Sequence, residues 1–588
     1  MSKFILCTNK NDYTNLESNF EDFYEKSSDT NGVFGWLCTY KKLRIATKNF
    51  YRNGTDFAAG VGTFFYNEKN DAAALEDILN AFNNDVNELR KKIVGSYCII
   101  IYKNKQLHIF VDAAGTYNVY YHLDEERKNI VITTTYYHVA KVCENIEIDK
   151  QMFISEWLHS ILLEPTMFKN VKKLMGDKAL TFTENFWEIQ SIGYSMRDFS
   201  ENMVESIKCM YYPLTKFNKS SIFLTGGQDS RLSLALLLSL KIKPLICYGR
   251  GNSSDTSTKQ KDLDIVNEIA RKYNLPIHYM NWNDSDQKNM NSYLSKYGEL
   301  FTLYCMNKNF FCEFEERIST EFICFGYFGE VFRTVELIES YNKEVFTLRE
   351  YIDEIYLAED VKIFNNEQYK IYSERIYELL LEICIQKQMK PEALTKKDFQ
   401  KLNTVYRQRW DTQLNNFANL FFYSCPLFGD KEITDIAEEE EYKYRLNSKY
   451  QMQLISKLES TILEVPFFSH IKVKEFNPDT YELIDKNMVS KNKDRIREII
   501  KNPKIIYFLK NIYYVLQRDP KGLQEIRSEH QEKMHLKKLL TDNRICEDVI
   551  NLKYAIDMMD ARRIKNLLLL KYLSDKVLNE TDKKTPTN

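Results

Sequence analysis

The chain has 588 residues, of which 44% are hydrophobic and 28% are charged. This composition excludes a collagen-like or largely disordered chain, and at roughly 100–200 residues per domain the length predicts about three folding units. The 81 Lys and Arg residues nearly balance the 83 Asp and Glu residues. Because the chain as a whole has no charge excess that would gather phosphates, we expect neither nucleic acid nor a membrane as its partner.

Twelve cysteines are dispersed along the chain, and none forms a Cys-x-x-Cys pair. This spacing argues against a structural zinc site and against a disulfide framework. The first apolar stretch is too short for a signal peptide, and no later stretch reaches the roughly 18 uncharged apolar residues of a membrane span. We therefore expect a protein of the reducing cytoplasm.

Residues 1–195 have the pattern of strands joined by tight turns. The clearest signal is a hairpin, in which residues 97–102 and 106–112 form two apolar strands separated by a three-residue turn. Strand patterns continue at residues 119–122 and 130–135. We predict an α+β domain for residues 1–195, built as a sandwich of antiparallel sheets.

Residues 196–490 change to alternating strands and helices. Three strands and two helices are expected, in the order 220–224, 232–240, 244–248, 262–273 and 276–279. Strands joined by crossover helices form a parallel sheet. From about residue 351 the pattern is mostly helical, and the acidic run 438–441 is typical of a solvated helix start. We predict an α/β parallel-sheet domain with a largely helical C-terminal part.

Residues 491–588 form the third predicted unit, a helical extension. It holds 22 Lys or Arg residues against 14 Asp or Glu residues. Charge runs of this kind are most often solvated faces of helices. Two interpretations stay open: amphipathic helices that pack over the core, and a binding surface for a carrier protein or a leader peptide.

The segment Thr225-Gly226-Gly227-Gln228-Asp229-Ser230 is the strongest functional signal in the sequence. It lies between a predicted buried strand and a helix, so that backbone N–H groups and the helix N-terminus point at one place and predict an anion site. The glycines permit close approach of phosphate oxygens, the two hydroxyls add donors, and Asp229 is suited to hold a divalent cation. The loop has neither the lysine of a Walker loop nor the spacing of a dinucleotide fingerprint. We predict a nucleotide site, and the alternative is a glycine-rich turn capped by Asp229.

This segment resembles the Ser-Gly-Gly-x-Asp-Ser loop of the asparagine synthetase superfamily. Five further segments resemble that family in the same order along the chain, at residues 167–176, 262–270, 326–333, 425–430 and 468–476. The resemblance implies a class II glutaminase-like domain followed by an ATP-pyrophosphatase domain. It also implies that ATP adenylates a carboxylate, that pyrophosphate leaves, and that an amine attacks the acyl adenylate.

The resemblance carries roles over to individual residues. The residues implied in ATP binding are Leu224, Thr225, Gly226, Gly227, Asp229, Ser230, Tyr248, Gly326 and Arg333. Magnesium would be held by Asp229 and by Glu330, which stands where the family has aspartate. Either Lys472 or Lys474 would face the phosphates or the developing oxyanion, and the spacing does not decide between them. The alternative for both lysines is an exposed cationic strand.

The N-terminal domain departs from glutamine-hydrolysing members of the family. Such enzymes expose a cysteine nucleophile at residue two after removal of Met1, but this chain has Ser2 there. Cys7 lies within the first apolar strand, where we expect it to pack in the core. The family's glutamine-binding segment Asn-Gly-Glu is also lost, because Val61 replaces the amide donor. We predict an inactive, scaffold-like domain.

An inactive glutaminase-like domain on a synthetase resembles β-lactam synthetases and lasso-peptide cyclases, which form an amide within one substrate. Tyr327 supports this comparison, because β-lactam-forming relatives carry a tyrosine three residues before the metal carboxylate, where it acts with a glutamate as general base. Glu354 and Glu359 are the candidate partners in this chain. The alternative is that Tyr327 packs beside the sheet.

The function expected from these observations is an ATP-dependent amide synthetase that does not use glutamine. Its substrate would be a small molecule or peptide with a carboxylate and an amine, as in lactam formation or peptide maturation, and its cofactors would be ATP and Mg²⁺. Two alternatives stay open. One is a synthetase that amidates a sugar acid or metabolite with free ammonia, and the other is a nucleotide-binding scaffold without turnover.

Overall fold

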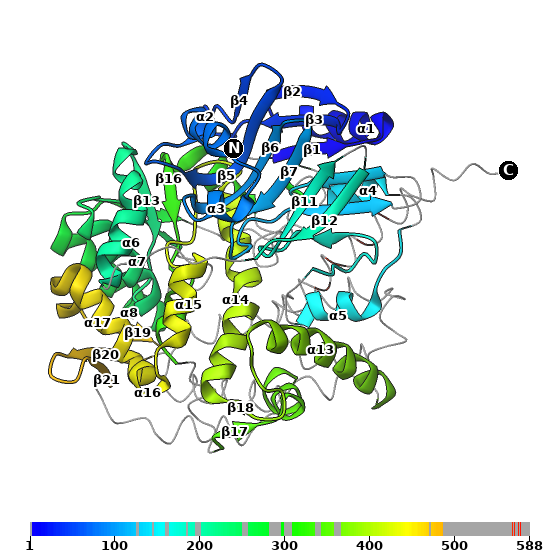
Figure 1. The fold of residues 1–588 in the computed structure, drawn as a ribbon. Coiled ribbons are helices and arrows are strands. Elements are labelled where there is room, and N and C mark those ends of the chain that lie inside the picture. Colours follow the sequence, from blue (N-terminus) through cyan, green and yellow to red (C-terminus); the bar gives the residue numbers. More distant parts are fainter. Residues whose placement is uncertain are drawn as a thin grey trace.

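The computed structural model describes residues 3–124, 129–143, 146–158, 164–183, 186–193, 202–249, 257–280, 296–298, 308–334, 343–357, 366–469 and 472–485, together with residues 567, 570, 574 and 577. The fold is mixed α/β, with two six-stranded antiparallel sheets, one four-stranded parallel sheet and many helices (Figure 1). At this level the structure agrees with the predicted fold class. None of the described helices has the length and apolar character that a membrane span requires.

The two antiparallel sheets are built from the first part of the chain. One has the strand order β10-β8-β9-β1-β3-β2 and the other the order β12-β11-β7-β6-β5-β4. Their strands are β1 (Lys3–Cys7), β2 (Lys26–Gly32), β3 (Gly35–Tyr40), β4 (Phe50–Asn53), β5 (Asp56–Phe65), β6 (Val94–Lys103), β7 (Gln106–Val111), β8 (Tyr120–Asp124), β9 (Asn129–Thr133), β10 (Lys172–Lys173), β11 (Lys178–Thr183) and β12 (Phe186–Ser191).

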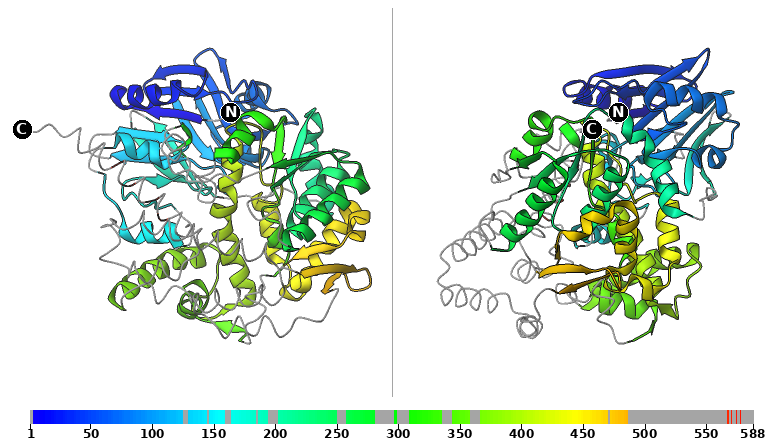
Figure 2. Two further views of the ribbon diagram at one scale, coloured as in Figure 1. Left: turned by 180° about the vertical axis from the view of Figure 1, so that it is seen from behind. Right: turned by 90° about the vertical axis from the view of Figure 1, so that its left-hand side faces the viewer.

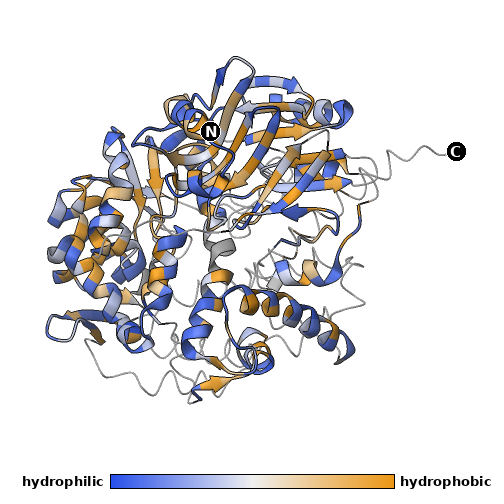
Figure 3. Ribbon diagram, viewed as in Figure 1, coloured by the Kyte–Doolittle hydropathy of each residue, from blue (hydrophilic) through white to orange (hydrophobic). Residues whose placement is uncertain are grey.

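Alternating apolar side chains of the two sheets share one core, to which β1 contributes Leu6, β5 contributes Val61 and β9 contributes Ile132. Apolar residues gather along these strands (Figure 3). The predicted hairpin is confirmed as β6 and β7. Its turn places Asn104 and Lys105 at φ 53° and 65°. These angles are those of a type I′ turn, whose twist matches that of the flanking strands.

Helices cover the outer face of each antiparallel sheet. Helices α1 (Lys10–Glu21) and α4 (Tyr136–Val142) pack on the first sheet, and α2 (Asp71–Ala81) and α3 (Val86–Arg90) pack on the second. In α1 the buried residues Tyr13, Leu16 and Phe20 recur at three- and four-residue spacing, which places them on one side of the helix. The predicted sandwich therefore consists of two sheets between two helical layers.

The parallel sheet has the strand order β15-β14-β13-β16. Its strands are β13 (Ser220–Phe223), β14 (Leu245–Gly249), β15 (Ile277–Met280) and β16 (Phe322–Cys324), and the crossover helices are α7 (Gln228–Ser239) and α8 (Ser257–Tyr273). The chain leaves β13 toward β14 and β15, whereas β16 lies on the other side of β13. The carboxyl ends of β13 and β16 therefore flank the point at which the strand order reverses, and ligands of open α/β sheets bind at such points.

Most of the remaining elements are helices. They are α5 (Lys150–Leu158), α6 (Met203–Tyr211), α10 (Lys308–Cys312), α12 (Leu348–Tyr351), α13 (Asn366–Gln386), α14 (Lys396–Ala418), α15 (Lys431–Glu439), α16 (Tyr442–Arg445) and α17 (Lys449–Glu459), with the short strands β17 (Val345–Phe346), β18 (Leu394–Thr395), β19 (Phe467–Ser469), β20 (Lys472–Asn477) and β21 (Glu482–Asp485). Helix α14 runs through the middle of the molecule, from β18 to the antiparallel sheets (Figures 1 and 2).

The prediction for the acidic run 438–441 is correct only at its last residue, because the exposed Glu441 is the N-cap of α16. Glu438 and Glu439 do not begin a helix but end α15. Glu438 is buried and pairs with Lys387 Nζ at 2.7 Å, and Glu439 accepts hydrogen bonds from Lys397 and Lys401. Carboxylates are unfavourable at a helix C-terminus. Lysines from neighbouring elements compensate for this, and a sequence pattern does not reveal such partners.

Most of the predicted extension 491–588 lies outside the described residues. The four described residues are helical and buried. Leu567, Leu570 and Val577 belong to the core that also contains α13 and the outer face of the first antiparallel sheet. Their spacing puts them on one side of a helix. This part of the extension therefore packs over the core.

Candidate functional site

The loop 225–227 connects β13 to α7 at the carboxyl edge of the parallel sheet. Its backbone N–H groups are hydrogen bonded within the chain: Thr225 N donates to Ser230 Oγ at 3.1 Å, and Gly227 N donates to Thr225 Oγ1 at 3.3 Å. Gly226 N donates to Asp262 Oδ1 at 2.7 Å. The amides that the sequence predicts to cradle an anion are therefore present at the expected place, but protein oxygens occupy them.

Asp262 of α8 joins the loop to the end of β14. Its Oδ1 accepts from the loop amide, and its Oδ2 accepts from Tyr248 OH at 2.9 Å. The Tyr248 side chain, predicted to bind ATP, is thereby held beside the loop. Asp262 begins one of the segments that resemble the family, but the resemblance assigns it no role. A role for Asp262 could have been predicted from its position after β14, because residues that follow neighbouring parallel strands meet at the same edge of the sheet.

The segment 326–333 follows β16 and lies directly on the first turn of α7. A Cβ atom on Gly326 would lie 2.4 Å from Ser230 N, and one on Gly329 would lie 2.7 Å from Asp229 Cβ. Only glycine permits such close approaches. The two predicted motifs, which are about a hundred residues apart in the chain, are therefore adjacent at the point where the strand order reverses.

Arg333 forms a two-point ion pair with Asp229. Its Nε donates to Asp229 Oδ1 at 3.1 Å, and its Nη2 donates to Asp229 Oδ2 at 2.9 Å. Gln451 Nε2 of α17 donates to the same Oδ1 at 2.8 Å and to Gly329 O at 2.9 Å. The side chains of Asp229 and Arg333 remain 27% and 18% exposed. Three segments distant in sequence thus converge on one carboxylate.

Arg231 lies beneath the loop and is fully buried. Its guanidinium donates to Val465 O at 2.6 Å, to Pro466 O at 2.7 Å and to Gly226 O at 3.3 Å. The guanidinium also stacks over the ring of Phe467, 3.7 Å from the ring centre. Burial lowers the pKa of Arg231 to about 9, which leaves it charged at neutral pH. Arg231 therefore ties the loop to β19.

Strand β19 touches the loop, since Phe468 N donates to Gly226 O at 2.8 Å. Lys474 of β20 is paired across the strands with Phe467 of β19. Its Nζ has no hydrogen-bond or ion-pair partner among the described residues, and its side chain is half-buried. Lys472 begins β20, but its side chain lies outside the described part of the chain. Of the two lysines predicted to face the phosphates, only Lys474 has a described side chain.

Tyr327 and Leu224 lie at the same sheet edge and make packing contacts. The ring of Tyr327 stacks on Phe325 at 5.6 Å, and Leu224 is buried in the core. Of the candidate partners of Tyr327, Glu354 lies in the turn Ile352–Tyr356, whose Ile352 belongs to a different hydrophobic core. Glu359 lies outside the described residues.

The residues predicted to hold magnesium do not fit that ion in this arrangement. Both carboxylate oxygens of Asp229 accept from N–H donors, whereas Mg²⁺ needs oxygen ligands in near-octahedral geometry. The residue of segment 326–333 that lies against Asp229 is Gly329, and Glu330 is buried one residue further on. Within the described ranges, no three His, Cys, Asp or Glu side chains gather as metal ligands.

The end of β5, where the sequence resemblance implied a lost glutamine-binding segment, lies against the C-terminal end of α14. Thr63 Oγ1 donates to Asn419 Oδ1 at 2.7 Å and accepts from Ser424 N at 2.7 Å. Lys42 Nζ donates to Asn419 O at 2.8 Å. Cys7 is buried as expected, and burial raises its pKa well above the usual value. Ser2 lies outside the described residues.

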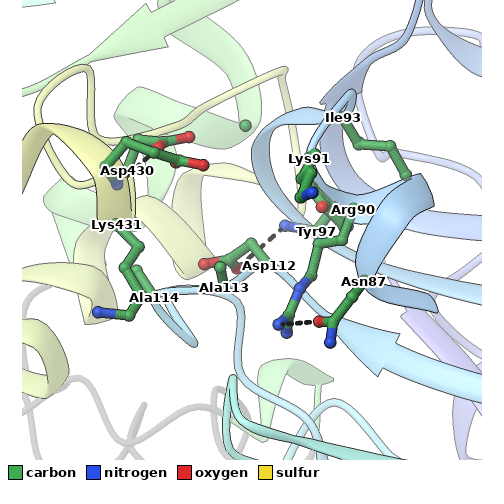
Figure 4. A pocket seen from close by; sticks show the side chains of 12 residues that line it. Asn87, Arg90, Lys91, Ile93, Tyr97, Asp112, Ala113, Ala114, Asp430 and Lys431 are labelled. Atoms are coloured by element: carbon green, nitrogen blue, oxygen red, sulfur yellow. Dashed lines mark hydrogen bonds between the residues drawn. The ribbon is translucent and has the colours of Figure 1, made fainter. Parts of the chain in front are cut away.

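Two cavities lie elsewhere. The cavity in Figure 4, bounded by Arg90, Asp112 and Asp430, has about 10 Å³ of free volume, which is room for about one water. The other has about 400 Å³ and lies between Asp71, Glu321 and neighbouring residues. Because Glu321 precedes β16, that cavity is at the amino edge of the parallel sheet, opposite the loop. We prefer the loop site because polar groups from several segments converge there.

No protein-family model matches the chain, and no curated protein sequence matches it significantly. Among solved structures, it is similar to glutamine phosphoribosylpyrophosphate amidotransferase from B. subtilis complexed with ADP and GMP, with 7% identity and a TM-score of 0.20 over 42% of this chain and 51% of that one. A structure of the allosteric regulatory enzyme of purine biosynthesis matches with 8% identity and a TM-score of 0.19 over the same shares. The chain thus spans about half the length of these structures. Similarity at this level supports no conclusion about function.

Proposed function

We propose that the chain is an ATP-dependent carbon–nitrogen ligase that adenylates a carboxylate, releases pyrophosphate and joins the acyl group to an amine. The observation that carries the proposal is the meeting of two motif segments at the reversal point of the parallel sheet. There Arg333 lies against the first turn of α7, beside the loop 225–227. A guanidinium beside a helix N-terminus is suited to a nucleotide's phosphates, which would replace the protein oxygens that now accept from the loop amides.

The proposed reaction has two steps. A carboxylate oxygen of the substrate attacks the α-phosphorus of ATP, and the bond from that phosphorus to the pyrophosphate oxygen breaks. The amine nitrogen then attacks the acyl carbon, AMP leaves with the bonding electrons, and the amine gives up a proton. Arg333 and Lys474 would stabilise charge on the departing pyrophosphate, and Tyr327 is the proposed acceptor of the proton, directly or through a relay.

The proposed substrate carries its own amine, as in lactam formation or peptide maturation. Glutamine is not the proposed nitrogen source, because Cys7 is buried and Thr63 is bonded to Asn419. The same observations leave free ammonia as an alternative nitrogen source, with a sugar acid or metabolite as acceptor. Binding of a carrier protein or leader peptide by residues 491–588 stays a prediction from the sequence, because most of these residues lie outside the described part of the chain.

A second candidate function is a nucleotide-binding scaffold without turnover. It is favoured by the occupied loop amides and by the pairing of Asp229 with Arg333. Nucleotide binding would require Gly226 N to exchange Asp262 for a phosphate oxygen. The two candidates share the site and differ in chemistry, so that release of pyrophosphate distinguishes them.

The test measures pyrophosphate release from ATP by the full chain with a panel of amino acids and short peptides, with and without added ammonia. The ligase proposal expects turnover with at least one substrate and its loss in Arg333→Gln. Arg349→Gln, which breaks an exposed ion pair with Glu374, is the matched control. A chain that binds a non-hydrolysable ATP analogue but releases no pyrophosphate supports the scaffold. Failure to bind the analogue contradicts both.

A further inference from the structure

We propose that this site binds the nucleotide's phosphates without a divalent metal, because the Arg333 guanidinium stands where a cation would contact Asp229. The proposal deepens the proposed function and rests on nucleotide binding at the loop 225–227. It concerns the charge that faces the phosphates, and it corrects the metal role that the sequence suggested for Asp229.

The Asp229 carboxylate is already bound by N–H donors on both of its oxygens. One edge of the Arg333 guanidinium binds both carboxylate oxygens, at 3.1 and 2.9 Å. Oδ1 also accepts from Gln451 Nε2 at 2.8 Å. A two-point arginine–carboxylate pair is among the stronger ion pairs in proteins. A metal ion would have to displace the guanidinium and the amide donor before it could bind these oxygens.

The position of segment 326–333 that packs against Asp229 carries no carboxylate. Gly329 is the residue that lies against Asp229, and a Cβ atom there would come within 3.0 Å of Asp229 Oδ1. A side chain at that position would therefore collide with Asp229 and could not share an ion with it. Glu330, the predicted second ligand, is buried one residue further along the chain.

Arg333 is held in place by contacts between its own segment and α7. Gln451 Nε2 bridges Asp229 and Gly329 O, and thus fixes the first turn of α7 to the segment that carries Arg333. A guanidinium has five N–H donors in a rigid plane and can bind a carboxylate and a phosphate together. A positive charge held in advance beside the loop 225–227 would reduce the need for a metal that must be recruited.

The experiment is a calorimetric titration of the full chain with α,β-methylene-ATP, once in excess EDTA and once in excess Mg²⁺. We expect the two dissociation constants to agree within about threefold, and Arg333→Gln to weaken binding in EDTA by about tenfold or more, as the loss of a charge-assisted contact predicts. Arg333→Lys keeps the charge but loses the planar fork and should fall between wild type and Arg333→Gln. Arg349→Gln serves as the control, and thermal unfolding checks that each variant folds.

A second experiment titrates the full chain with Mn²⁺ alone. Electron paramagnetic resonance measures the concentration of the free ion. We expect wild type and Asp229→Asn to bind the same amount of Mn²⁺. Binding of the analogue only in Mg²⁺, or Mn²⁺ binding that depends on Asp229, would overturn the inference and leave the proposed function standing. Failure of the analogue to bind in either medium would overturn both.

Discussion

At the scale of single residues, the candidate site depends on buried charges that the chain itself neutralises. Arg231 is the clearest example, since three backbone carbonyls from two segments share its guanidinium. It lies two residues after Asp229 in α7, and its side chain points to β19 while Asp229 meets Arg333. The first turn of α7 thus contacts the loop 225–227 and β19 through Arg231, and it contacts Arg333 through Asp229.

We predict that Arg231→Met lowers the free energy of unfolding by about 2–5 kcal/mol, because it removes the guanidinium donor of the Val465 and Pro466 carbonyls, while Gly226 O keeps only its bond from Phe468 N. Urea denaturation of the variant against wild type measures this change. Arg375→Met, at an exposed ion pair with Glu378, should change it by less than about 0.5 kcal/mol. A change for Arg231→Met no larger than that of the control would contradict the assigned role.

At the scale of elements, charged side chains determine how helices end and meet. Helix α15 ends in Glu438 and Glu439, and lysines of α14 bind Glu439. These hydrogen bonds, first from Lys401 and then from Lys397, lower the pKa of Glu439 to about 2 from the usual 4.5. The ionised form is therefore favoured more in the folded state than in the unfolded state.

Because the folded-state pKa of Glu439 is depressed, its contribution to stability is fully present above pH 4.5 and is lost as the pH falls toward 2. We predict that Glu439→Gln lowers the free energy of unfolding at neutral pH and that its difference from wild type shrinks over this range. Chemical denaturation at a series of pH values tests the prediction. A difference that stays constant from pH 7 to pH 2.5 would contradict it.

At the scale of the whole molecule, the antiparallel sheets and the later domain meet across a buried polar contact. Lys42 Nζ donates to Asn419 O and lies over the ring of Tyr423. Burial lowers the pKa of Lys42 to about 7 from the usual 10.5. The charged lysine is therefore tolerated at this interface at a cost in stability.

Between pH 7 and 10.5 the unfolded chain binds a proton at Lys42 that the folded chain has released, so that this group makes stability rise with pH in that window. We predict that Lys42→Met removes this rise. Denaturation of wild type and variant from pH 7 to 10 measures it, with Lys41→Met, whose ammonium group pairs with Glu25, as the control. Parallel pH profiles for wild type and Lys42→Met would be the contrary result.

Local pattern predicted much of the architecture. The period of apolar residues located the hairpin β6–β7 and the strands β13 to β15, because alternation and turn residues act over a few positions. It placed the start of α7 at residue 232, four residues late, because the polar residues of its first turn resemble the loop. The acidic run was assigned to a helix start, which holds for Glu441 before α16 but not for Glu438 and Glu439, whose lysine partners come from other elements.

The sequence by itself determined the order of elements and the loop 225–227, because these depend on side-chain periodicity and on two adjacent glycines. Only the tertiary structure decided what the loop touches. The ion pair of Asp229 and Arg333 spans 104 positions, and the contact with Gln451 spans 222. Such pairings follow from the strand order of the parallel sheet and from packing of α17 on α7, both of which are non-local.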